Sequence, residues 1–136
     1  MQSSTHKKRF YVAPVFTGPQ GHILLSEHAG KLTLPARSLE VPSENAINGE
    51  IAILQRIYGL VIDPKKVDFQ YVESLDEDGC LEVFAVAWRP VFKTPTHHGR
   101  HVRLTWRQPE ELEGEEISPL LRLVLENGYQ PLRQVA

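Results

Sequence analysis

Cysteine is nearly absent from this chain, since Cys80 is the only one among 136 residues. A single thiol excludes an internal disulfide framework and is typical of a protein that works in a reducing compartment. Cys80 begins a mostly apolar segment and has no basic residue beside it that would activate the thiol. We therefore expect a buried structural cysteine rather than a catalytic nucleophile.

Long apolar runs are also missing. No stretch approaches the roughly 20 residues of a transmembrane helix, and the N-terminal segment MQSSTHKKRF lacks the apolar core of a signal peptide. Neither sign of charge dominates, because 15 lysines and arginines stand against 17 aspartates and glutamates, for a net charge of −2. This balance offers no global attraction to nucleic acid or to an anionic membrane. We expect a soluble, cytoplasmic protein with neither of these partners.

The segments that are present alternate between strand-like and helix-like patterns. Strand-like segments are rich in β-branched and aromatic residues, or alternate apolar and polar residues with period two. Turn formers such as Gly18 and Pro19 separate them. These criteria predict strands over residues 9–16, 22–27, 31–35, 67–75, 80–92 and 101–106. The long apolar segment 80–92 is the best candidate for a central strand.

Residues 43–58 are predicted to form the first helix. Ser43 is a favourable N-cap, and Gly59 is a favourable stop because glycine readily adopts the left-handed conformation that ends a helix. One apolar stripe at helical spacing marks the face towards the core: Ile47, Ile51, Leu54 and Tyr58. A second helix is predicted over residues 119–127, with Ser118 as its cap.

The order of these segments predicts the fold class. Strands, a helix, more strands and a final helix are typical of an α+β domain or of a three-layer α/β/α sandwich around a mixed sheet. We expect the two helices to cover opposite faces of the sheet, and residues 36–42 and 93–100 to be loops. Residues 9–130 are predicted to form a single domain between short tails at residues 1–8 and 131–136.

Three stretches carry a resemblance to a known family: VAPVFTGPQGHILLSEHAGKLTLP, RLTWRQPEEL and SPLLRLVLENGY. They resemble, in turn, the opening strands and Leu-Pro, the late strand, and the C-terminal helix of the Nudix family, over residues 10–129. The resemblance implies an α/β/α sandwich with a mixed sheet, and a homodimer. Where the family's catalytic residues are present, it also implies Mg²⁺-dependent hydrolysis of a nucleoside diphosphate-linked compound.

The signature of that family is a glycine, five residues, a glutamate, seven residues, and then Arg-Glu-apolar-X-Glu-Glu-X-Gly-apolar. The stretch LPARSLEVPSENAINGEIAILQRIYGL, aligned on Gly59 and Leu60, places Glu44 at the first glutamate and Leu54 at the apolar position. The other signature positions carry residues without its chemistry: Ser38, Ala52, Ile53, Arg56 and Ile57. The resemblance extends to the fold but not to the metal-binding glutamates.

The flank of the helix that would hold a metal ion is therefore poor in oxygen. Mg²⁺ requires oxygen ligands in octahedral array, and the implied hydrolysis requires that ion. Residues at i, i+3 and i+4 share a helix face, and here that face carries Ala46, Glu50, Ile53 and Ile57. We expect no metal site, no cofactor and no hydrolase activity. The predicted function is a module that binds a nucleotide-like small molecule or a protein partner.

Two alternatives remain open. A true hydrolase could draw Mg²⁺ ligands from Glu40, Glu44, Glu50 and a histidine loop, with Glu44 and Glu50 as its catalytic residues. A purely structural subunit of a larger complex would be as inert as the binding module. An assay with Mg²⁺ or Mn²⁺ and diphosphate compounds separates the enzyme from the other two, and thermal stabilisation by a ligand separates a binding module from a scaffold.

Basic side chains are the predicted ligand contacts. Arg56 is the foremost, because a guanidinium at a glutamate position of the signature could hold a phosphate directly. The other predicted contacts are Arg37, Lys93, His98 and Arg100. The last two belong to the segment THHGRH, whose histidines could bind zinc or phosphate or simply be solvated. We expect this loop to be exposed and free of metal.

Overall fold

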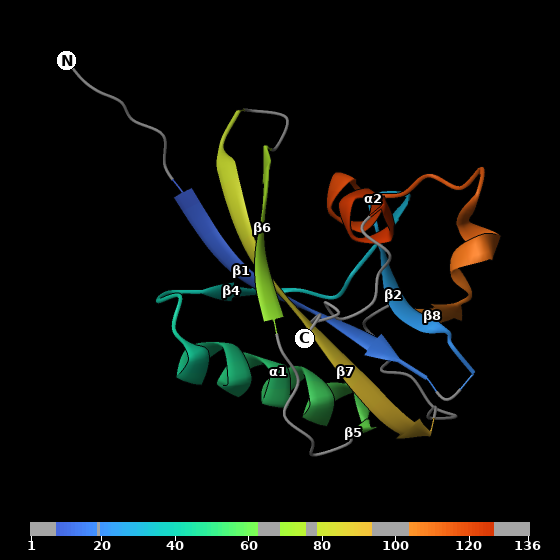
Figure 1. Cartoon of the computed structure of the whole chain (residues 1–136), viewed down its shortest axis with the longest axis horizontal. Coiled ribbons are helices and arrows are strands. Elements are labelled where there is room, and N and C mark those ends of the chain that lie inside the picture. Colours follow the sequence, from blue (N-terminus) through green and yellow to red (C-terminus); the bar gives the residue numbers. More distant parts are fainter. Residues whose placement is uncertain (1–7, 19, 63–68, 76–78, 94–103, 127–136) are drawn as a thin grey trace, which may run out of the picture.

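The computed structural model describes residues 8–18, 20–62, 69–75, 79–93 and 104–126. It contains a sheet with one α-helix on each face, a long one on the first and a short one on the second (Figure 1). The strands are β1 (Lys8–Thr17), β2 (Ile23–His28), β3 (Lys31–Thr33), β4 (Arg37–Leu39), β5 (Val61–Ile62), β6 (Phe69–Leu75), β7 (Leu81–Lys93) and β8 (Leu104–Arg107). The helices are α1 (Glu44–Tyr58), the short 3-10 helix η1 (Pro109–Leu112) and α2 (Pro119–Glu126).

The centre of the sheet is a parallel pair. β1 and β7 lie side by side from Lys8 opposite Leu81 to Thr17 opposite Pro90. β5 and β6 pair antiparallel with β7, while β2 and β4 pair antiparallel with β1. The predicted mixed sheet is therefore confirmed. Parallel strands in the middle of a sheet are usually buried on both faces, which agrees with the run of buried residues in β1.

Each face of the sheet carries its own hydrophobic cluster. Alternate residues of β7 point to opposite faces, so Ala85 and Ala87 pack against α1 while Phe84, Val86 and Trp88 pack against α2. The buried residues of α1 are those of the predicted stripe, and α2 buries Leu120, Leu121 and Val124. The predicted three-layer α/β/α arrangement is confirmed.

Helix α1 begins and ends where the sequence predicts. The Ser43 side chain accepts a hydrogen bond from the Ala46 amide at 3.2 Å, which satisfies one of the donors left open in the first turn. Gly59 adopts the left-handed conformation with a φ of 67°, and its amide donates to the Arg56 carbonyl. Both predicted ends of α1 are therefore confirmed.

Two short strands were not expected from the sequence. Residues 36–42, predicted to be a loop, include β4, which pairs with residues 10–12 of β1. β5 is likewise absent from the prediction and pairs with the end of β7. Strands of two or three residues are too short to show a period, so only the pairing partner reveals them.

Cys80 and Lys93 lie in surroundings that differ from those predicted. Cys80, predicted to be buried, is half-buried because it lies just before β7 rather than within it. Lys93, predicted to begin a loop, is the last residue of β7. The rest of the segment with the histidines lies outside the described residues. Within the described part of the chain, no helix is both long enough and apolar enough to cross a membrane.

The turn between β2 and β3 contains a strained residue. Ala29 and Gly30 connect the paired residues His28 and Lys31, and both have a positive φ, 55° and 80°. This combination is typical of a type I′ turn, which suits glycine and asparagine but strains other residues with a Cβ.

Replacing Ala29 with asparagine is expected to raise the free energy of unfolding by about 1 kcal/mol, because asparagine tolerates the left-handed conformation better than alanine does. Urea denaturation measures the change. Ala29→Val, whose branched Cβ tolerates a positive φ poorly, should lower the stability instead. Equal stability of the three proteins would contradict the strained turn.

Candidate functional site

The flank of α1 next to β4 holds an ion pair. Arg37 in β4 donates a hydrogen bond from Nε to Oε1 of Glu50 in α1 at 2.5 Å. The two side chains are 38% and 28% exposed, so water screens part of their attraction. The Glu50 carboxylate is thus already paired with the Arg37 guanidinium, and a metal ion at this carboxylate would have to compete with it.

Arg37 also acts on Tyr58, the last residue of α1. Burial raises the pKa of the Tyr58 phenol, while the positive charge of Arg37 acts in the opposite direction. Because the folded state favours the neutral phenol, this contribution to stability is complete below the ordinary tyrosine pKa of about 10 and is lost as the pH rises through the raised value. One guanidinium therefore influences two acidic groups of the same helix.

A cavity of about 650 Å³, here called the Arg37 cavity, surrounds this ion pair. Its lining residues come from the residue before β4, β4 itself, the loop after it and the first half of α1: Ala36, Arg37, Ser38, Leu39, Glu40, Val41, Ala46 and Glu50. Two carboxylates and one guanidinium make the lining negative by one charge. Further along α1, Ile53 is half-buried and Ile57 is 50% exposed, and neither offers an oxygen. Among the described residues, no group of three or more His, Cys, Asp or Glu side chains is arranged to hold a metal ion.

Of the predicted site residues, the structure brings together Arg37 and Glu50. Glu44 is exposed in the first turn of α1, and Arg56 is exposed on the same helix. Neither is among the residues that line the Arg37 cavity. The remaining predicted contacts lie outside the described residues: the side chain of Lys93, His98 and Arg100.

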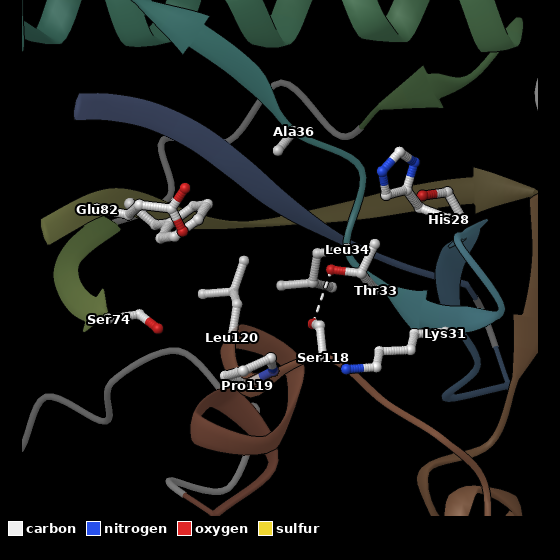
Figure 2. A pocket seen from close by; sticks show the side chains of 12 residues that line it. His28, Lys31, Thr33, Leu34, Ala36, Ser74, Glu82, Ser118, Pro119 and Leu120 are labelled. Atoms are coloured by element: carbon white, nitrogen blue, oxygen red, sulfur yellow. Dashed lines mark hydrogen bonds between the residues drawn. The ribbon is translucent and has the colours of Figure 1, made fainter. Parts of the chain in front are cut away.

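A second cavity, here called the α2 cavity, lies between the beginning of α2 and the sheet (Figure 2). Its volume is about 430 Å³. Part of its wall is apolar, with Leu34, Phe84 and Leu120, and the ring of Phe84 stacks on Tyr11 with 5.0 Å between the ring centroids. The other lining residues are Ser26, His28, Lys31, Thr33, Ala36, Ser74, Glu82, Ser118 and Pro119.

Hydrogen bonds between β3 and the residues before α2 hold one wall of the α2 cavity. The Ser118 hydroxyl donates to the Thr33 hydroxyl at 2.8 Å (Figure 2). It also accepts from the Leu121 amide at 3.1 Å. Leu32 donates its amide to the Glu116 carbonyl and accepts from the Ser118 amide, both at 2.9 Å. The cap of α2 is therefore also its attachment to the sheet.

Sequence reasoning missed the polar residues of the α2 cavity. Lys31, Ser74 and Glu82 occupy strand positions at which an alternating pattern places polar residues in any case, so no local signal distinguishes them. They become neighbours because the sheet brings β3, β6 and β7 to the same helix. The signal that could have found them is the pairing of the strands, which the sequence pattern does not specify.

No family model and no curated protein matches the sequence. Solved structures do match it. A Nudix hydrolase from Nitrosomonas europaea is 20% identical over 96% of this chain and 98% of its own, with a TM-score of 0.68. The Nudix domain of Shewanella oneidensis NrtR, complexed with ADP ribose, is 14% identical over 92% of this chain and 89% of its own, also with a TM-score of 0.68. The chain has the Nudix fold.

Another match to the Nudix-fold chain comes from a protein complex. The C-terminal domain of mouse MUTYH, in complex with human PCNA, is 15% identical over 95% of this chain and 95% of its own, with a TM-score of 0.65. The resemblance inferred from the sequence is confirmed at the level of the fold. At such identities the likeness shows the fold alone, because function depends on the side chains of the site.

When the Nudix signature is placed on α1, the glutamate positions in its second half are occupied by other residues. The alignment on Gly59 puts Ile53, Arg56 and Ile57 at glutamate positions, with Ile53 half-buried and the other two exposed. Arg37 stands one residue before the position of the leading glycine and binds Glu50. On this flank, α1 therefore keeps one carboxylate, and an arginine holds it.

Proposed function

We propose that this Nudix-fold chain is a binding module without hydrolase activity, and that its ligand is a nucleotide-like small molecule held in the α2 cavity. The observation that carries the proposal is the ion pair between Arg37 and Glu50, at a flank where Mg²⁺ would need oxygen ligands. Ile53 and Ile57 add none. Without the metal ion, the phosphates of a bound compound are not neutralised and no water is activated to attack them.

The α2 cavity supports the binding half of the proposal. Its volume of about 430 Å³ falls within the range of about 300–1,000 Å³ that is typical of small-molecule sites. Apolar walls with a few polar groups are also typical of such sites. Ala36 lines both cavities, so the two cavities adjoin, and under this proposal an anionic group of the ligand points towards Arg37. Arg37 is therefore the best supported of the predicted phosphate contacts.

A hydrolase is the second candidate, because Glu40 and Glu50 line the same cavity. If Arg37 moved away from Glu50, these two carboxylates would be free to supply oxygen ligands to a metal ion. A protein-binding module is the third candidate. It is supported by the exposed side chain of Ile57 and by the likeness to a MUTYH domain that was solved in complex with PCNA.

A hydrolysis assay combined with thermal unfolding tests these candidates. With Mg²⁺ or Mn²⁺ and a panel of nucleoside diphosphate compounds that includes ADP ribose, we expect no product above that formed by the Glu44→Gln/Glu50→Gln double variant. A ligand at a hundred times its Kd should stabilise the chain by about 2.7 kcal/mol, which raises the unfolding midpoint. Arg37→Ala should weaken the binding of phosphorylated compounds and leave the fold intact. Arg56→Ala should leave this binding unchanged, because Arg56 lines neither cavity.

The outcomes separate the three candidates. Hydrolysis that the double variant abolishes would overturn the proposal and establish the hydrolase. If hydrolysis persists in the double variant, adding Glu40→Gln tests the remaining carboxylate of the Arg37 cavity. Hydrolysis that survives this change as well indicates a contaminating enzyme. Neither hydrolysis nor stabilisation by any compound of the panel would overturn ligand binding and favour the protein-binding module.

A further inference from the structure

Two cross-strand pairs lie on opposite sides of the α2 cavity. His28 and Lys31 face each other across the β2–β3 hairpin, and Ser74 and Glu82 face each other between β6 and β7. All four line the cavity, the first pair on one side and the second on the other (Figure 2). The cavity therefore has a basic pole at Lys31 and an acidic pole at Glu82.

The charged groups at both poles are available to a ligand. Among the described residues, neither Lys31 nor Glu82 forms an ion pair or a side-chain hydrogen bond. Glu82 is half-buried, so its carboxylate has lost part of its hydration, and no donor from the described part of the chain replaces the lost water. The Ser118 and Thr33 hydroxyls at the cavity wall, by contrast, are bonded to each other.

The wall between the two poles is apolar. Leu34, Phe84 and Leu120 line it, and Phe84 is held in place by its stacking on Tyr11. An apolar wall lowers the local dielectric and so strengthens the attraction of each pole for a complementary group. A fixed aromatic ring also suits a flat ligand, because stacked rings attract each other beyond the area that they bury.

We infer that the α2 cavity selects a purine nucleotide whose base donates two adjacent N–H groups, as guanine does, to Glu82. The inference rests on the proposed function and adds the class of ligand. An ionised carboxylate only accepts hydrogen bonds, and its two oxygens match two parallel donors. The corresponding edge of adenine places one donor beside an acceptor and is disfavoured. On the other side of the cavity, the Lys31 ammonium attracts the phosphate.

Calorimetric titration of the whole chain with GMP, guanosine and IMP, without metal, tests each pole separately. Guanosine lacks only the phosphate of GMP, and IMP lacks only its 2-amino group. GMP is expected to bind about tenfold more tightly than either, as one charge-assisted hydrogen bond would produce. Lys31→Gln should reduce the preference over guanosine and keep the preference over IMP, whereas Glu82→Gln should reduce the preference over IMP and keep the preference over guanosine.

Arg122→Gln and Glu113→Gln are matched controls, because both residues are exposed and lie outside the lining of the α2 cavity. They should keep both preferences, and thermal unfolding of every variant verifies the fold. The inference is wrong if the three ligands bind equally, if both preferences survive the Lys31 and Glu82 substitutions, or if another compound of the panel binds and GMP does not. The proposed function survives each of these results. It fails together with the inference only if GMP and the whole panel leave the chain unbound.

Discussion

The Leu121→Ala variant is expected to lose about 3 kcal/mol of its free energy of unfolding. Leu121 is 0% exposed and packs in the cluster between α2 and the sheet. Its truncation removes apolar contacts and leaves a void that the neighbouring side chains fill only in part. Helix α2 has eight residues, and a helix that short depends on its packing more than on its own hydrogen bonds.

Urea denaturation followed by tryptophan fluorescence measures this loss, since Trp88 lies in the same cluster as Leu121. The control is Arg122→Ala, at the adjacent exposed position, which should change the stability by less than about 0.5 kcal/mol. A loss below about 1 kcal/mol for Leu121→Ala would contradict the packing of α2 on this face. The wall of the α2 cavity that depends on α2 would then be in doubt as well.

The largest functional change is expected from restoring glutamates to α1. The triple variant Ile53→Glu, Arg56→Glu, Ile57→Glu should bind Mn²⁺ with a Kd on the order of a millimolar or tighter, whereas the unmodified chain should show no binding in that range. The three positions follow Glu50 at helical spacing, and none of them is fully buried, so the new carboxylates can remain ionised. The substitution of Arg56 also removes a positive charge from the surroundings of the ion.

Electron paramagnetic resonance of free Mn²⁺ measures this binding directly. The matched control replaces the same three residues with glutamine, which has nearly the same shape without the charge and should leave Mn²⁺ free. Acidic residues near the C-terminal end of a helix oppose its dipole, so the glutamate variant should also be less stable by roughly 1 kcal/mol. If the unmodified chain bound Mn²⁺ as tightly as the glutamate variant, the argument from missing ligands would fail and the hydrolase would become the better candidate.

Under the proposed function, Arg37 contacts the phosphate of the ligand where the Nudix signature implies a metal ion. A guanidinium is permanently charged and can hold a phosphate through two parallel hydrogen bonds. It cannot lower the pKa of a water molecule as a bound metal ion does. A Nudix fold with Arg37 beside Glu50 is thus suited to retain a phosphorylated ligand without cleaving it.

Local features of the fold could be predicted from neighbouring residues. The boundaries of α1 depend on Ser43 and Gly59, which act within one helical turn. The buried stripe of α1 and the long strand β7 follow from periods that are visible in the sequence. The resemblance to the Nudix family could likewise be inferred from the order of residues alone, whereas the lack of its metal-binding glutamates stays a prediction from the alignment.

Contacts between distant segments could not be predicted in this way. Arg37 and Glu50 are 13 residues apart, and their contact requires β4, a strand of three residues that forms because β1 lies beside it. Ser118 and Thr33 are 85 residues apart, and Lys31 and Glu82 share the α2 cavity from different strand pairs. Which strands pair, and in which register, is decided by packing over the whole sheet, because many registers satisfy the same alternating pattern. The sequence by itself therefore determined the layers and the helices, and it predicts that the metal-binding glutamates are missing. Only the tertiary structure decided that an arginine holds the remaining carboxylate of the α1 flank, and that a lysine and a glutamate line one cavity.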